Sequence, residues 1–339
     1  MGINKEIIRT GNKFMPGRLN QITDVHGVSV GHFTLKQGNI QTGVTAILPY
    51  QGNCFREKCV AAAHVINGFG KSVGLMQIQE LGTLETPVIL TNTFAVGTAS
   101  TALIRYMLAN NPDIGVTTGS VNPVVMECND SNLNDIRGMH ITEEHVMAAI
   151  AAAEEREPGF EEGAVGAGTG MSCYGLKGGI GSASRIIPID HHEYTLGVLA
   201  LTNFGKLEEL VVYGDPVGRK IASARASAAA SEESERGSVI VLIATDMPLT
   251  ARQLGRAARR AQNGLARTGT ITGNGSGDIV LAFSTANKVS HYPERSITHA
   301  KYLHEDYLDK VFAAVTETVE ESVISSLTHA ETNELIQLV

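Results

Sequence analysis

The sequence predicts a layered domain built from both strands and helices, of the α/β or α+β class. Short apolar runs bounded by glycine, proline or a Thr-Asn pair recur through the first two thirds of the chain. In the last third, two nearly continuous apolar runs alternate with patterns of helical period. Such a mixture is typical of strands and helices packed in layers around one core, but periodicity alone does not choose the topology.

Three of the early apolar runs predict strands, at residues 44–48, 88–90 and 195–201. Residues 142–155 predict a helix, because the threonine at its start can cap the first turn and a proline follows its end. The stretch 163–181 is dense in glycine and must form loops or tight turns in part.

The last third begins with Ser238, which heads the β-branched run SVIVLIATD and predicts a buried strand. The sequence TARQ at 250–253 has capping-box spacing and opens a helix whose apolar face continues to Leu265. The arginines on that helix predict a solvated face rather than an anion site. Residues 279–283 predict a second buried strand, and residues 308–323 carry apolar side chains at helical spacing.

The composition is that of a globular chain with a sizeable core, with 43% hydrophobic and 18% charged residues. The net charge of -8 argues against a general nucleic-acid binder, which needs a basic face. The first residues lack the apolar region of a secretory signal, and no apolar run approaches the length of a membrane span. We therefore expect a cytoplasmic protein with no nucleic-acid or membrane partner.

Residues 222–237 interrupt the alternation of strands and helices. They read ASARASAAASEESERG and contain no large apolar residue. Their composition is typical of an exposed, mobile segment or surface loop. This segment ends directly before the buried strand that Ser238 begins.

The Gly237-Ser238 pair therefore has a chemical interpretation. A serine hydroxyl at the head of a buried strand can attack the carbonyl before it, and glycine permits a strained backbone there. An N→O acyl shift and hydrolysis would free Ser238 as a new N-terminus, whose α-amine can serve as a base. On these residues alone, a turn is the more common role of a Gly-Ser pair.

Eight stretches of the chain together resemble the DmpA-type L-aminopeptidase/D-esterase family, which includes the β-peptidyl aminopeptidases. They occur in family order, cover nearly the whole chain, and are specific as a set rather than singly. They are ITDVHGV at 22–28, HVINGFGKS at 64–72, ELGTLETP at 80–87, LNDIRG at 133–138, GAVGAGTG at 163–170, Gly237-Ser238, ATD at 244–246 and the run 267–287.

The resemblance implies an α+β fold, a four-layer αββα sandwich that is similar to the N-terminal-nucleophile hydrolases but differs in connectivity. It implies one domain over residues 1–339 that cuts itself into an α chain 1–237 and a β chain 238–339. It also implies that processed αβ units assemble, usually as a tetramer of heterodimers. The implied activity releases N-terminal residues from short peptides, amides or esters, including D- or β-aminoacyl compounds, without a metal or other cofactor.

The resemblance also implies roles for individual residues. Ser238 matches the nucleophile, and Ser276 and Asp278 match the groups that orient it and relay protons. Asn203 matches the amide that helps form the oxyanion hole, where donors must face developing negative charge. Glu127 is a candidate anchor for the ammonium group of the substrate.

Each of these residues also has a purely structural interpretation. The GNGSGD stretch that contains Asp278 is typical of a glycine turn ahead of a strand, with the aspartate as a local cap. Asn203 can be a left-handed turn residue ahead of Gly205. Glu127 can be an ordinary surface or capping charge.

The chain departs from the family pattern at one place. Active aminopeptidases of the family carry a tyrosine near the stretch that matches 127–132, whereas this chain has no tyrosine between Tyr106 and Tyr174. Asn129 or Asn132 would have to replace that tyrosine as a hydrogen-bond donor at the substrate, without the acidity of a phenol. The departure bears on substrate range and rate.

Two other enzyme classes deserve comparison. The GAGTG sequence at 166–170, with Asp190 about twenty residues on, suggests a dinucleotide site, but its spacing is not G-x-G-x-x-G and no apolar strand precedes it. A metal hydrolase could use histidines, but there is no H-E-x-x-H motif and no Cys/His cluster. The candidate histidines are His140, His145, His191 and His192.

The chain has four scattered cysteines, and we expect them to be buried thiols. They are Cys54, Cys59, Cys128 and Cys173.

Two alternatives remain within the same fold. One is an amine acyltransferase like the ornithine acetyltransferases, which have a similar fold but a threonine nucleophile, so that Ser238 counts against it. The other is a scaffold that cuts itself and hydrolyses little else, an alternative that the absent tyrosine keeps open.

Overall fold

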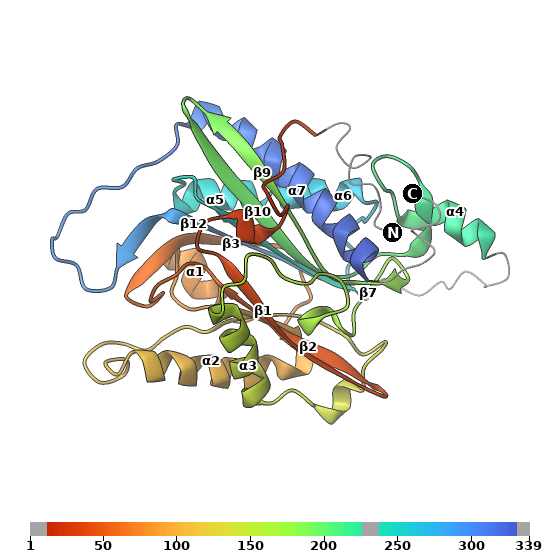
Figure 1. The fold of residues 1–339 in the computed structure, drawn as a ribbon, viewed down its shortest axis with the longest axis horizontal. Helices are drawn as coiled ribbons and strands as arrows, with labels where there is room; N and C mark the ends of the chain where they lie inside the picture. Colours follow the sequence, from red (N-terminus) through yellow and green to blue (C-terminus); the bar gives the residue numbers. More distant parts are fainter. Residues whose placement is uncertain (1–11, 226–236, 331–339) are drawn as a thin grey trace.

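Two β-sheets lie face to face between two layers of helices in the computed structural model, which describes residues 12–225 and 237–330 (Figure 1). The larger sheet runs β4 (Thr83–Leu84), β3 (Glu57–Gly68), β12 (Gly277–Ser290), β11 (Ser238–Thr245), β10 (His192–Asn203) and β9 (Gly179–Ile189). The smaller sheet runs β1 (Ser29–Gln37), β2 (Ile40–Leu48), β5 (Val88–Asn92) and β6 (Val124–Cys128). This arrangement confirms the predicted α+β sandwich of the αββα type.

Helices cover the outer face of each sheet (Figure 1). The larger sheet packs against α5 (Ala251–Ala258) and α7 (Leu308–His329), and α6 (Ala261–Arg267) packs on α7. The smaller sheet packs against α2 (Val96–Asn110) and α3 (Glu143–Glu154). The remaining elements are α1 (Leu75–Leu81), α4 (Val217–Ala224) and a hairpin of β7 (Ser172–Cys173) and β8 (Leu176–Lys177).

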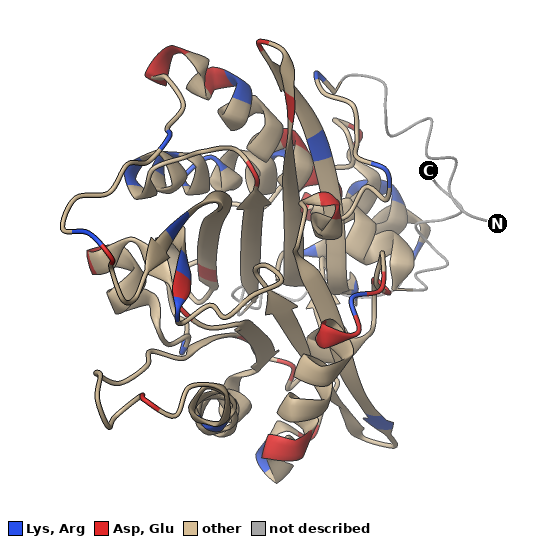
Figure 2. Ribbon diagram, turned by 60° about the vertical axis from the view of Figure 1, so that its left-hand side comes forward, with Lys and Arg blue, Asp and Glu red and all other residues tan. Residues whose placement is uncertain are grey.

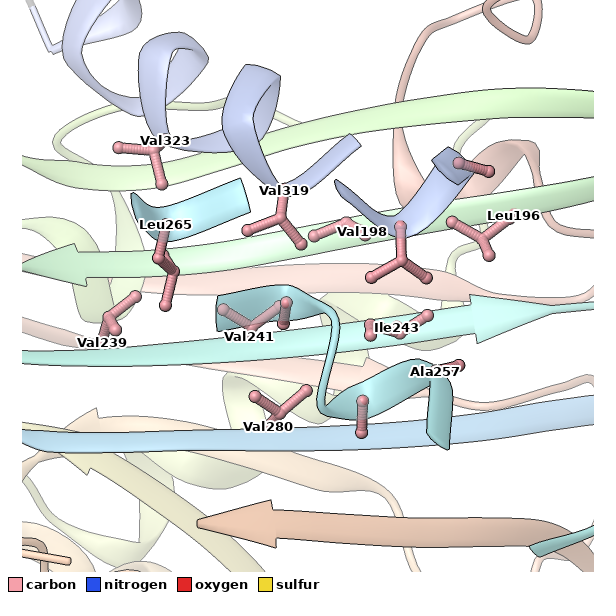
Figure 3. Packing of buried hydrophobic residues seen from close by; sticks show 14 of the residues in the cluster. Leu196, Val198, Val239, Val241, Ile243, Ala257, Leu265, Val280, Val319 and Val323 are labelled. Carbon is pink, nitrogen blue, oxygen red and sulfur yellow. The ribbon is translucent and has the colours of Figure 1, made fainter. Parts of the chain in front are cut away.

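The strand β11 shows why an uninterrupted apolar run is needed in this fold. Its successive side chains point to opposite faces of the sheet, and both faces are covered. Val239, Val241 and Ile243 pack under the helices, as Figure 3 shows, while Ile240 and Leu242 pack between the two sheets. All eight residues of β11 are buried, so the strand holds its first residue at a fixed place.

All five strands that the sequence predicts lie where the structure has strands. The runs at 44–48, 88–90 and 195–201 fall within β2, β5 and β10, and the two buried strands of the last third are β11 and β12. The helix predicted at 142–155 is α3, with Thr142 at its N-cap position as expected. The glycine-rich stretch 163–181 contains a short 3₁₀ helix, Gly166–Gly168, and the tight β7–β8 hairpin.

The single helix predicted from 250 to Leu265 is wrong, because the structure divides it into α5 and α6. The N–H of Arg260 bonds to the carbonyl of Ala257, three residues back, which tightens the chain into a turn between the two helices. The apolar face continues across this turn, with Leu254 and Leu265 in the same core. The hydrophobic period therefore carries no sign of the break.

Charged residues lie mainly on helices, loops and strand ends, as Figure 2 shows. The arginines predicted to form a solvated face make local contacts, since Arg252 and Arg256 pair with Glu305 and Arg260 stacks on the ring of Phe312. In the described ranges, no helix is both long and apolar enough to cross a membrane. Of the segment 222–237, residues 226–236 lie outside the described residues.

Candidate active site

The candidate residues lie where several strands end together. Ser238 is the first residue of β11 and is paired with Asn203, the last residue of the antiparallel strand β10. On its other side Ser238 is paired with Gly277, the first residue of the parallel strand β12. The end of β3, at Gly68, is paired with the same glycine. Residues far apart in the sequence are thus brought to one edge of the larger sheet.

The Ser238 hydroxyl is buried and held by two backbone groups. It donates a hydrogen bond to the carbonyl oxygen of Gly237 at 2.8 Å and accepts one from the N–H of Gly277 at 3.2 Å. The hydroxyl oxygen therefore lies beside the carbonyl of the peptide bond that joins residues 237 and 238. The N–H of Gly277 donates to the hydroxyl oxygen, so it would stabilise negative charge on that oxygen as its proton leaves.

Gly237 lies against the neighbouring strand so closely that no side chain fits. A Cβ added at this residue would lie 2.5 Å from the carbonyl oxygen of Asn203 and 2.5 Å from the Cα of Phe204. Both are backbone atoms that cannot move without disturbing β10. The glycine therefore allows the main chain before Ser238 to lie this close to the end of β10.

Ser276 and Asp278 form a buried pair on either side of Gly277. The Ser276 hydroxyl donates a hydrogen bond of 2.5 Å to Oδ1 of Asp278. The side-chain amide of Asn67, at the end of β3, donates to the backbone carbonyls of Gly273, Asn274 and Ser276. Asn67 thereby fixes the glycine-rich turn that carries this pair next to Ser238.

The side-chain amide of Asn203 is oriented by two backbone groups of opposite kind. Its Oδ1 accepts a hydrogen bond from the N–H of Ser172 at 2.9 Å, and its Nδ2 donates to the carbonyl of Asn129 at 2.9 Å. Exchanging the two atoms would oppose donor to donor and acceptor to acceptor. An amide nitrogen has two hydrogens, and the bond to Asn129 uses one of them.

Glu127 is buried at the end of β6, although one structural interpretation made it a surface charge. Its carboxylate accepts hydrogen bonds from the N–H of Lys71, at 2.8 Å, and from the Thr93 hydroxyl. A Cβ on Gly70 would lie 3.6 Å from this carboxylate and 3.7 Å from the Cα of Gly277. Glu127 and the strand end at Gly277 thus both lie next to Gly70.

The two asparagines that could replace the absent tyrosine lie on the loop after β6. The backbone carbonyl of Asn129 contacts Asn203, as described, while its side chain accepts the N–H of Ser131 at 3.0 Å. Asn132 is exposed on the turn that follows. Among the hydrogen bonds of residues 12–225 and 237–330, none joins its side chain to the site. A substrate role for either side chain stays a prediction.

The four cysteines are buried thiols, as predicted. Cys128 lies next to Glu127 in the chain. Burial, and then the charges of Glu127 and Asp278, raise the pKa of Cys128 well above its usual range. A thiol in this state stays protonated and is a poor nucleophile.

The glycines of the GAGTG sequence have a packing role in this structure. A Cβ on Gly166 would lie 2.4 Å from Thr45 Oγ1, and one on Gly168 would lie 2.6 Å from the backbone nitrogen of Ile180. The histidines proposed for a metal site have other surroundings, since His140 bonds to Asp135 and His145 stacks on Phe33. No cluster of metal-ligating side chains occurs in the described part of the chain.

Sequence reasoning missed the groups that hold the site residues in place. Asn67 and Lys71 lie in the HVINGFGKS motif, which pointed to the family but to no role for either residue. No sequence motif marks Thr93 or Ser172. Thr93 acts through a hydroxyl that many residues share, and Ser172 acts through its backbone N–H. Only the three-dimensional arrangement brings these groups to Glu127 and Asn203.

Comparisons with known proteins place the chain among peptidases. A family model described as Peptidase family S58 matches residues 20–337. The beta-peptidyl aminopeptidase BapA of Sphingosinicella microcystinivorans is 38% identical over 94% of this chain and 83% of its own length. The corresponding enzyme of Sphingosinicella xenopeptidilytica is 35% identical over 94% and 82%.

Solved structures show the same fold. A protein of Pyrococcus horikoshii OT3 is 49% identical with a TM-score of 0.90, over 99% of this chain and 98% of that one. The L-aminopeptidase D-Ala-esterase/amidase of Ochrobactrum anthropi is 35% identical with a TM-score of 0.85, over 96% and 90%. It is described as a prototype for the serine aminopeptidases and a variant of the Ntn hydrolase fold.

Proposed function

The chain belongs to peptidase family S58 and is a peptide hydrolase, and we propose that it is a self-processing serine aminopeptidase or amidase whose nucleophile is Ser238. The observation that carries the proposal is the position of the Ser238 hydroxyl, which touches the Gly237 carbonyl and the Gly277 N–H. The adjacent Asn203 amide and the Ser276–Asp278 pair support it.

Self-cleavage begins when Ser238 Oγ attacks the carbonyl carbon of Gly237. The peptide C–N bond breaks, the departing nitrogen takes a proton, and the acyl group passes to the hydroxyl oxygen as an ester. Water then hydrolyses this ester. The products are an α chain that ends in the Gly237 carboxylate and a β chain that begins with the free amine of Ser238.

The processed enzyme uses the same hydroxyl on its substrates. Ser238 Oγ attacks the substrate carbonyl, and its proton passes to a base, for which the new α-amine and the Ser276–Asp278 pair are the candidates. The second hydrogen of Asn203 Nδ2 stabilises the oxyanion of the tetrahedral intermediate. The bond from the substrate carbonyl to its leaving amine or alcohol then breaks, and the leaving group takes the proton from the base. Water hydrolyses the acyl-enzyme that remains and restores the serine.

Glu127 selects substrates with a free amine. A buried carboxylate that already accepts two hydrogen bonds is pre-organised to receive an ammonium group. We propose short peptides, amides or esters with an L-, D- or β-aminoacyl end as substrates, because the relatives are named for such activities. We also propose that processed αβ units assemble as a tetramer.

The proposal predicts discrimination between free and blocked amines. The purified protein should hydrolyse aminoacyl p-nitroanilides and should leave the N-acetylated forms of the same compounds uncut. Glu127→Gln removes the charge that binds the ammonium, so kcat/KM for the free-amine compounds should fall about 10- to 100-fold, the equivalent of one charged hydrogen bond. Release of p-nitroaniline gives both parameters.

Glu80→Gln is the matched control, because it removes the same charge from an exposed position on α1. Its kcat/KM should equal that of the natural chain. Equal turnover of the free-amine and acetylated compounds would refute the role of Glu127. In a separate experiment, loss of all activity on exhaustive chelation would favour a metal hydrolase instead.

A further inference from the structure

The β7–β8 hairpin contains a lysine whose ammonium group points at the backbone rather than at solvent. Lys177 Nζ donates hydrogen bonds to the carbonyls of Met171 at 2.8 Å, Gly178 at 3.0 Å and Gly168 at 3.2 Å. An ammonium group has three hydrogens, which matches these three acceptors. The side chain thus ties together the ends of the glycine-rich loop that precedes β9.

One of these carbonyls leads directly to the candidate oxyanion donor. The carbonyl of Met171 and the N–H of Ser172 belong to the same peptide group, and that N–H bonds to Asn203 Oδ1 at 2.9 Å. The positive charge of the ammonium group beside the carbonyl oxygen polarises the peptide and makes its N–H a stronger donor. The ammonium is therefore joined to Asn203 through one rigid peptide plane.

Burial, and then the nearby charge of Lys36, lower the pKa of Lys177 to about 8. At neutral pH the side chain therefore remains largely protonated and keeps its three donors. Burial of the cation costs free energy, and the three hydrogen bonds to carbonyls offset part of that cost.

We propose that Lys177 is a positioning residue for the reaction: through the Met171–Ser172 peptide it holds the Asn203 amide with its nitrogen turned toward the oxyanion. This inference rests on the proposed function, because it assigns Asn203 to the oxyanion. Lys177 touches neither the substrate nor Ser238 in this mechanism. Its effect should appear in kcat, where transition-state stabilisation is measured, and not in KM.

Lys177→Met keeps the apolar stem and removes the donors. In processed protein, kcat for an aminoacyl p-nitroanilide should fall about 10- to 100-fold, the usual effect of a displaced catalytic group, and KM should stay within about threefold. Lys177→Arg keeps the charge but cannot place three donors from one atom. Its kcat should therefore lie between that of the natural chain and that of Lys177→Met. This second variant also provides a result if Lys177→Met does not fold.

Tyr174→Phe is the matched control. It removes a buried hydrogen bond from the same hairpin, between the Tyr174 hydroxyl and Thr268 at 2.7 Å, without touching the Met171–Ser172 peptide. Its melting temperature should fall while its kcat stays unchanged. If Lys177→Met and Tyr174→Phe lower the melting temperature alike and neither changes kcat, the lysine only staples the loop and the inference is wrong.

A double-mutant cycle separates this inference from the proposed function. If Lys177 acts through Asn203, then Lys177→Met should cause no further loss of kcat in an Asn203→Ala background. Additive losses would overturn the inference while leaving the proposed function intact. If Asn203→Ala alone leaves kcat unchanged, the oxyanion assignment fails, and the inference fails with it.

Discussion

Ser238→Ala is expected to leave the chain in one piece and to abolish hydrolysis. One hydroxyl serves both reactions, since it attacks first the Gly237 carbonyl and then the carbonyl of each substrate. Loss of a serine nucleophile in a hydrolase costs on the order of 10⁶ in kcat. Denaturing gels report the cleavage, and aminoacyl p-nitroanilide turnover reports the hydrolysis.

Ser284→Ala is a suitable control for the loss of a buried serine. Ser284 lies on β12, away from the strand ends that form the site, and its hydroxyl donates a hydrogen bond to the carbonyl of Met247. This variant should lose some stability but should still cut itself and turn over substrate. Turnover by a folded Ser238→Ala protein would remove Ser238 from the mechanism.

Asn203→Ala is expected to lower kcat by about 10²–10³-fold, the usual loss for one oxyanion donor and equivalent to about 2.7–4 kcal/mol. The change removes the amide that bridges the Ser172 N–H and the Asn129 carbonyl, so some loss of stability is expected too. Measuring kcat, KM and melting temperature on processed protein separates the two effects. Self-cleavage should also slow if it passes through the same kind of intermediate.

Asn203→Asp provides the second arm of this experiment. It keeps the shape and the acceptor for Ser172 but replaces the donor with a carboxylate oxygen, which repels an oxyanion. Its kcat should be at least as low as that of Asn203→Ala. Unchanged kcat in either variant, with a lower melting temperature, would make Asn203 a structural turn residue.

The strands that the sequence predicted are those that a local apolar run encodes, whereas strands such as β1, β3, β6 and β9 were not predicted. The buried run from Ser238 follows from composition alone, and α3 follows from its capping threonine. The order of the strands depends on pairings between distant residues, which hydrophobic period does not report. The αββα arrangement therefore came from the family resemblance, as did the candidate site residues.

What the sequence could not provide is the set of backbone contacts that hold the site. The N–H of Gly277 donates to the Ser238 hydroxyl, and Gly237 lies against the end of β10 where no side chain fits. Neither contact can be read from a glycine in the sequence. Lys177 looks like an ordinary lysine until its three carbonyl partners are known. Such contacts are set by register and chain direction rather than by residue type.

The central claim is that the chain cuts itself between Gly237 and Ser238, and denaturing mass spectrometry of the purified, folded protein tests it most directly. We expect two chains of about 25 and 11 kDa in place of one of 36.0 kDa, the smaller beginning with a free amine on Ser238. A single intact mass after long incubation of the folded protein, or a cut at any other bond, would contradict the account.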